Sequence, residues 1–148
     1  MFQQPRPLTM PHHYRVEVGP LTAGNNWTYT PDARTWIQAN SIVIVLNTDA
    51  TVATRRLVLV MGGPTDDDII IPSRVTQAAS LSYQYIFLYN IGFIDATAAA
   101  SRVMLPLPQK HMIQNPENIR TEITNLQAGD VITAVKARLY LWQDPVFV

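Results

Sequence analysis

The sequence has no cysteine among its 148 residues. This excludes disulfides, thiolate metal sites and cysteine nucleophiles, and it fits a protein made in a reducing cytosol. Long hydrophobic runs are missing too: the longest have about five to six residues, whereas a membrane helix needs roughly 20. The first 13 residues contain no apolar segment of the kind found in secretory signals. We therefore expect no membrane association.

Charge is also scarce. Charged residues make up 15% of the chain, against roughly 25% in typical soluble domains, and hydrophobic residues make up 47%. The 11 basic and 11 acidic residues balance, so we expect no nucleic-acid partner, which would require clustered Lys and Arg. Two interpretations stay open: a sandwich with an uncharged polar surface, or a subunit largely covered by its neighbours.

The central stretch of the chain runs from Trp36 to Met61. Two apolar, β-branched runs, residues 42–46 and 57–61, flank a polar segment that ends in Arg55 and Arg56. This pattern predicts two core strands joined by a surface loop. One of the two arginines is expected to point inward, where it must be paired.

Further strands are predicted from period-two alternation and from turn residues at their ends. The run of residues 131–142 also contains helix formers, but its alternation and the preceding Gly-Asp turn favour a strand, with Ile132 on the same face as Trp142. Pro106 places its strand at an edge or an end of a sheet. The remaining candidates are residues 14–18, 27–30, 69–71 (a short buried strand), 81–90, 102–107 and 119–123.

About eight strands with almost no helix predict an all-β fold, a two-sheet antiparallel β-sandwich of jelly-roll type. Residues 14–148 form its single domain. Residues 1–13 carry three prolines and are predicted to be an extended N-terminal arm. The interface candidates in this arm are the apolar anchors Phe2, Leu8 and Met10, with Arg6 as a charge partner.

Catalytic motifs are missing from the sequence. It has no Gly-x-Ser-x-Gly elbow and no Gly-rich phosphate loop. The pair His12 and His13 lacks further convergent metal ligands. Residues 66–68, three aspartates, fit a solubilising loop or a partner for an adjacent subunit better than a cation site, although a bound cation stays open. We therefore expect no enzyme activity and no cofactor.

Three tryptophans raise the alternative of a carbohydrate-binding module. Trp36 and the set Tyr83, Tyr85 and Phe87 are expected to lie in the core. Trp27 and Trp142 are expected to be exposed or interfacial, which makes them candidate contact residues. A small hydrolase built on a β-sandwich would be a further alternative, and it would need a convergent pair of acids.

Several loose motifs in residues 14–145 are Tyr29-Thr-Pro31, Trp36, Arg55-Arg56, and the segments MLPLP (104–108), AGD (128–130) and WQD (142–144). Together they resemble small virion proteins of tailed bacteriophages. Such proteins look like jelly-roll cement or decoration subunits on the capsid surface. The resemblance implies a non-enzymatic virion protein, assembled in the host cytoplasm, that bridges major capsid proteins as a homotrimer or homodimer. A neck, tail or head-fibre-base protein is the nearest alternative.

Overall fold

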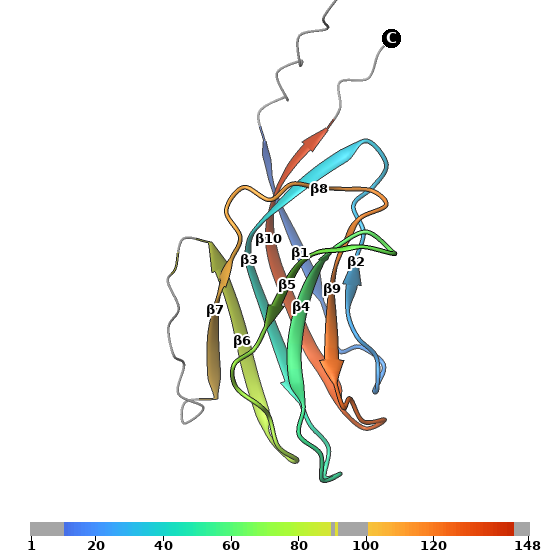
Figure 1. Ribbon diagram of the computed structural model, residues 1–148, viewed down its shortest axis with the longest axis vertical. Helices are drawn as coiled ribbons and strands as arrows, with labels where there is room; N and C mark the ends of the chain where they lie inside the picture. The colour runs from blue at the N-terminus through green and yellow to red at the C-terminus, as the bar shows by residue number, and fades with distance from the viewer. Residues whose placement is uncertain (1–10, 90, 92–100, 144–148) are drawn as a thin grey trace, which may run out of the picture.

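A computed structural model describes residues 11–89, 91 and 101–143 of the chain (Figure 1). In these residues the chain forms ten strands and no helix. The strands are β1 (His12–Val18), β2 (Thr28–Tyr29), β3 (Thr35–Asn47), β4 (Arg56–Gly62), β5 (Asp67–Pro72), β6 (Ser82–Tyr89), β7 (Arg102–Leu107), β8 (Ile113–Gln114), β9 (Asn118–Thr124) and β10 (Val131–Gln143).

The strands form two sheets. Sheet A has the order β1-β10-β3-β6-β7, with β8 beside the start of β3, and sheet B has the order β2-β9-β4-β5. Every pair is antiparallel except β6 with β7. The pairs β4–β5, β3–β6, β2–β9 and β1–β10 are nested, as in one long hairpin rolled around a core. This nesting defines a jelly roll and confirms the predicted fold class.

The predicted central strands are present as β3 and β4. They lie in opposite sheets, so the loop between them crosses from one layer to the other. The predicted strand at residues 131–142 is present as β10, and β7 lies at an edge of sheet A, as Pro106 indicated. The prediction of a buried strand at residues 69–71 is wrong. β5 is an edge strand, and Ile70 is 57% exposed.

The core lies between the sheets and consists of alternate side chains from both. Two register shifts between β10 and β3 interrupt the alternation, one of them between Ile132 and Ala134. A shift of this kind inserts an extra residue and reverses the faces of the residues beyond it. Ile132 is therefore 1% exposed and packs in the core, whereas simple alternation placed it on the outer face with Trp142.

The start of β1 lies beside the end of β10, because His12 pairs with Leu141. The connections β3–β4, β5–β6 and β9–β10 meet at the opposite end of the sandwich (Figure 1). The arm was predicted to end at residue 13, but His12 and His13 already belong to β1, so the sandwich begins at His12. The predicted arm anchors, residues 2 to 10, lie outside the described residues.

Candidate functional site

A buried arginine closes the end of the sandwich where the β3–β4 and β9–β10 connections meet. Arg55 is 0% exposed, and its Nε and Nη2 each donate a hydrogen bond of 2.9 Å to the carboxylate of Asp130. Nη2 also donates to Asp49 at 2.7 Å. Nη1 donates to the carbonyls of Thr51 and Ala53. All five guanidinium N–H groups are therefore used, and the prediction of one inward, paired arginine is confirmed.

The carboxylate of Asp130 is 1% exposed. Burial favours its neutral form, but hydrogen bonds from Arg55 and from the amides of Gln127 and Asp49 outweigh burial and lower the pKa of Asp130 below its ordinary value. The hydrogen bond to Asp130 likewise raises the pKa of Arg55, against the effect of burial. Both partners are therefore held in their charged forms.

Neighbouring side chains complete this polar end. The backbone of Arg55 exchanges two hydrogen bonds with Gln77, whose side chain donates to the carbonyls of Leu46 and Leu81. The hydroxyl of Tyr85 donates to the side-chain oxygen Oε1 of Gln77 at 2.9 Å. The chain itself uses every donor of Arg55, so this cluster holds three connections together and offers that guanidinium no free N–H for a ligand.

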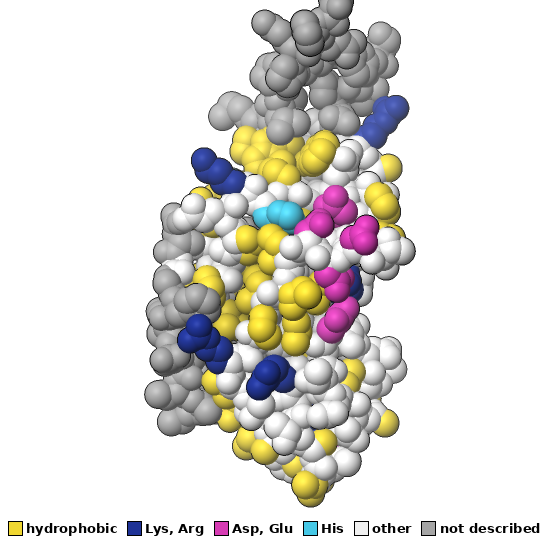
Figure 2. All heavy atoms as spheres, viewed as in Figure 1, with side chains coloured by type: hydrophobic (Ala, Val, Ile, Leu, Met, Phe, Trp, Pro, Cys, Tyr) yellow, Lys and Arg dark blue, Asp and Glu magenta, His cyan; other side chains and the backbone are white. Residues whose placement is uncertain are grey.

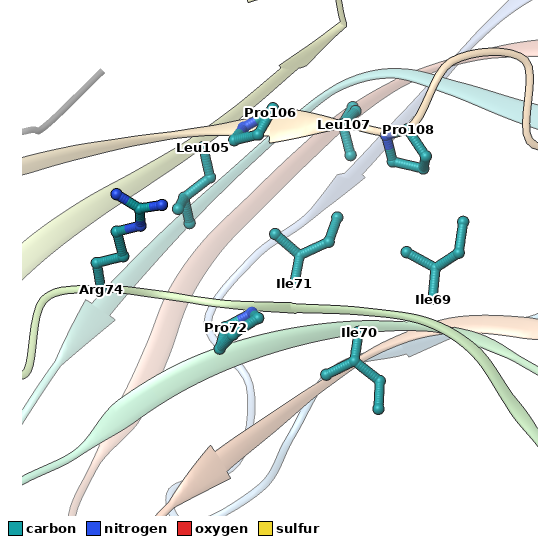
Figure 3. Close-up of a pocket in the computed structure, with 9 residues that line it drawn as sticks. All are labelled: Ile69, Ile70, Ile71, Pro72, Arg74, Leu105, Pro106, Leu107 and Pro108. Atoms are coloured by element: carbon teal, nitrogen blue, oxygen red, sulfur yellow. The ribbon is translucent and has the colours of Figure 1, made fainter. Parts of the chain in front are cut away.

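An apolar groove opens between the edge strands β5 and β7 (Figures 2 and 3). Its volume is about 430 Å³. Ile69 and Ile71 point across it toward β7, and Arg74 lies at one end (Figure 3). Pro72 and Pro106 stand in the two edge strands and lack the N–H that strand addition uses. We therefore expect a partner in this groove to make side-chain contacts.

A second open surface is the outer face of sheet A. Its centre is formed by half-buried apolar side chains from three adjacent strands. Val43 lies opposite Ile86, and Ile86 lies opposite Met104, which gives a continuous apolar row. The outward positions Val45 and Leu88 extend this row. Apolar side chains thus remain partly open to water on a face that no other described element covers.

Charged side chains border this row over β1 and β10. Arg15 lies directly opposite Arg138, and Glu17 lies opposite Lys136. Like charges in this position repel each other. Arg15 is 4.0 Å from Glu17, with both side chains more than half exposed. Within the described residues, no carboxylate forms an ion pair with Arg138 or Lys136.

These four residues line a hollow of about 320 Å³, which we call the basic hollow. Three cations and one carboxylate surround it, and Val43 and Leu88 provide apolar wall. The basic hollow therefore combines an excess of positive charge with access to the apolar row, and an anionic group with some apolar surface would fit both.

Aromatic side chains continue the outer face toward the chain ends. The rings of His13 and Tyr140 are 4.9 Å apart, and those of Tyr140 and Trp142 are 6.2 Å apart. Trp142 lies opposite Trp36. Trp142 is half-buried at the surface, which keeps it a candidate contact residue. Trp36 was expected in the core, but it too is half-buried and faces outward.

The expectation that Trp27 is exposed is wrong. Trp27 is 4% exposed and belongs to the hydrophobic core. The backbone of Trp27 is bound to β9 by two hydrogen bonds of 2.9 Å. Its amide donates to the hydroxyl of Thr121, and its carbonyl accepts from the amide of Thr121. The predicted core positions Tyr83, Tyr85 and Phe87 are confirmed as buried.

The three aspartates at residues 66–68 are exposed; Asp66 ends the turn between β4 and β5, and Asp67 and Asp68 begin β5. Asp67 pairs with Arg120. Among the described residues, no group of three or more His, Cys, Asp or Glu side chains could hold a metal ion. In the same part of the chain, no helix has the length and apolar character to cross a membrane.

Sequence reasoning missed the basic hollow. The alternation of β1 and β10 placed Arg15, Lys136 and Arg138 on outward positions, which was the available signal. Their convergence depends on the pairing of the first strand with the last, and local patterns do not show that pairing.

No family model, curated protein or solved structure matches this chain. The class to which the molecule belongs is therefore given by its architecture, a jelly-roll β-sandwich. Jelly rolls occur in viral capsid proteins and in lectins, so function has to be argued from the surfaces.

Proposed function

We propose that this protein is a non-enzymatic virion structural protein, a capsid cement subunit that bridges and stabilises major capsid proteins. The outer face of sheet A carries this proposal. It joins an apolar centre, represented by Val43 and Ile86, to a border of Arg and aromatic side chains. That arrangement, an apolar core with aromatic and Arg anchors, is typical of protein–protein interfaces.

Bridging requires contact with more than one neighbour. The molecule offers two open apolar surfaces on different parts of the sandwich, the outer face of sheet A and the groove between β5 and β7. A subunit that fills both surfaces joins two partners through one rigid domain. The low charged fraction of 15% agrees with a surface that neighbours cover.

The N-terminal arm gives this proposal a third contact. Its prolines restrict the unbound chain, so less conformational entropy is lost when a partner orders it. Phe2, Leu8 and Met10 would then serve as anchors and Arg6 as a charge partner. Deletion of residues 1–10 spares β1 entirely and tests the arm without disturbing the sheet.

Immunogold electron microscopy of purified virus particles tests the location, with an antibody raised against this protein. We expect labels spread over the capsid surface. Labels confined to the neck or tail would favour the alternative of a neck, tail or head-fibre-base protein, and particles without label would contradict a virion role. Particles stripped of this protein should bind the native chain well and a chain that lacks residues 1–10 weakly, while the thermal unfolding of the shortened chain stays unchanged.

The aromatic row favours a second candidate, a carbohydrate-binding module. Trp36, Tyr140 and Trp142 lie on one face and are each half-buried, and aromatic rings provide large apolar faces for a ligand. A glycan array compares the native protein with Trp142→Ala. Hits that disappear in the variant would support this candidate, and an array without hits would dispose of it.

A further inference from the structure

We propose that the basic hollow binds residues 66–68 of a second copy of this chain, which we call the acidic β4–β5 turn: Asp66 ends the connection, and Asp67 and Asp68 begin β5. This inference rests on the proposed function in one respect, since it supplies the contact between copies in that assembly. The partner is specified by chemistry: a carboxylate for the facing arginines and an apolar side chain for the wall of the hollow.

The demand for a carboxylate comes from the facing pair Arg15 and Arg138. Two guanidinium groups opposite each other repel unless an anion lies between them. Glu17 lies 4.0 Å from Arg15 and opposite Lys136. This single carboxylate neutralises only part of the positive charge of the three cations around the hollow. Guanidinium groups bind carboxylates through paired, charge-assisted hydrogen bonds. An incoming aspartate would therefore relieve the repulsion.

The distribution of charge over the two sheets points to a copy of the same chain. The strands of sheet A carry four cationic side chains and one anionic, namely Arg15, Arg102, Lys136, Arg138 and Glu17. The strands of sheet B carry two cationic and three anionic, namely Arg56, Arg120, Asp67, Asp68 and Glu122. Asp66 immediately precedes β5. In a chain with no net charge, the strands of sheet A thus carry an excess of positive charge and those of sheet B a small excess of negative charge.

The β4–β5 turn has the form of a ligand for this hollow. Asp66 and Asp68 are exposed, and within the described residues neither forms an ion pair. The turn is tight, because a Cβ at Gly62 would collide with the backbone of Asp66 and Asp68. Ile70 lies two residues beyond Asp68 on the same face of β5 and is 57% exposed. It would meet the apolar wall of the hollow.

A contact between two different surfaces is heterologous. Copies joined this way form a closed ring if the rotation between them closes, and an open filament if it does not. The homotrimer predicted from the sequence would be the closed form, with each hollow filled by the turn of the next copy. A symmetric dimer would have to form the contact twice, with each hollow taking the turn of the other copy.

Charge reversal tests the contact by sedimentation velocity. We expect the native protein to exceed its monomer mass of 16.6 kDa at low salt and to dissociate at high salt. Arg138→Glu alone and Asp66→Lys/Asp68→Lys alone should each remain monomeric. An equal mixture of the two should associate again, because the native hollow of the Asp66→Lys/Asp68→Lys variant accepts the native turn of the Arg138→Glu variant, and the reversed hollow matches the reversed turn. Arg56→Glu makes the same change in charge outside the contact and should associate like the native protein.

A native protein that stays monomeric at low salt would overturn the proposal. So would an Arg138→Glu variant that associates normally, or a mixture that stays monomeric. Attachment to virus particles separates this failure from failure of the proposed function. A protein that binds particles but never associates in solution would remove the contact between copies and leave the cement role in place.

Discussion

Two arginine sites of this chain differ in how many hydrogen-bond and ion-pair partners the guanidinium group has. Arg55 is fully buried, and each of its N–H groups meets an acceptor. Arg138 lies on the surface opposite Arg15 and has no carboxylate partner among the described residues. A buried charge without partners would prevent folding, whereas water screens an exposed charge at little cost. We therefore assign Arg55, which has all its partners within the chain, to the stability of the fold. We assign Arg138, which has no carboxylate partner among the described residues, to binding.

Removing the buried guanidinium should have the largest effect. Arg55→Ala leaves Asp130 buried without its partner, and breaking such a pair costs about 3–5 kcal/mol. Urea unfolding measures this loss. The matched control is Arg56→Ala, one residue further and exposed, which should change stability by less than about 0.5 kcal/mol. Equal losses in the two variants would contradict the structural role of Arg55.

A lysine at each site sharpens the comparison. Arg55→Lys keeps the charge but loses the two-pronged contact with Asp130 and leaves buried acceptors unsatisfied, which costs about 1–3 kcal/mol. Arg138→Lys should leave the unfolding midpoint in urea unchanged. A stable Arg55→Lys protein would show that charge alone, without the geometry of the fork, holds this end of the sandwich.

Acid should destabilise the protein through Asp130. Its pKa in the folded state is lowered, so its contribution is complete above the ordinary aspartate pKa of about 3.9 and is lost as pH falls toward the lowered value. Urea unfolding at a series of pH values below about 4 should show a steep loss in the native protein. The loss should be shallower in Asp130→Asn, while Asp68→Asn, at an exposed position, should follow the native curve. Identical slopes in all three would contradict this assignment.

The smallest effect is expected at the surface pair. In a protein kept monomeric by Asp66→Lys/Asp68→Lys, Arg138→Gln removes the repulsion with Arg15, so stability should rise by a few tenths of a kcal/mol at low salt and by less at high salt. Differential scanning calorimetry at two salt concentrations would detect the change. A clear loss of stability would mean that Arg138 is part of the fold, and the comparison between the two sites would fail.

Strand positions could be predicted because alternation is a local property, and the inward arginine followed from the same alternation. Its partner could not be predicted, since Asp130 is 75 residues away and meets Arg55 only after both sheets close. The bulge that turns Ile132 inward leaves no local signal. Trp27 was misplaced because it precedes the short edge strand β2, and its hydrogen bonds to Thr121 join it to a strand 94 residues away. Charge on the outer face was visible in the sequence, but its convergence was not.

The central claim is that neighbours cover the outer face of sheet A in the assembled particle. Methionine oxidation followed by mass spectrometry tests it directly, because Met104 lies on that face and Met61, at 1% exposure, is an internal control in the core. We predict that Met104 oxidises readily in the isolated domain and several-fold more slowly in purified particles, with Met61 protected in both. Equal oxidation of Met104 in the two states would contradict the account.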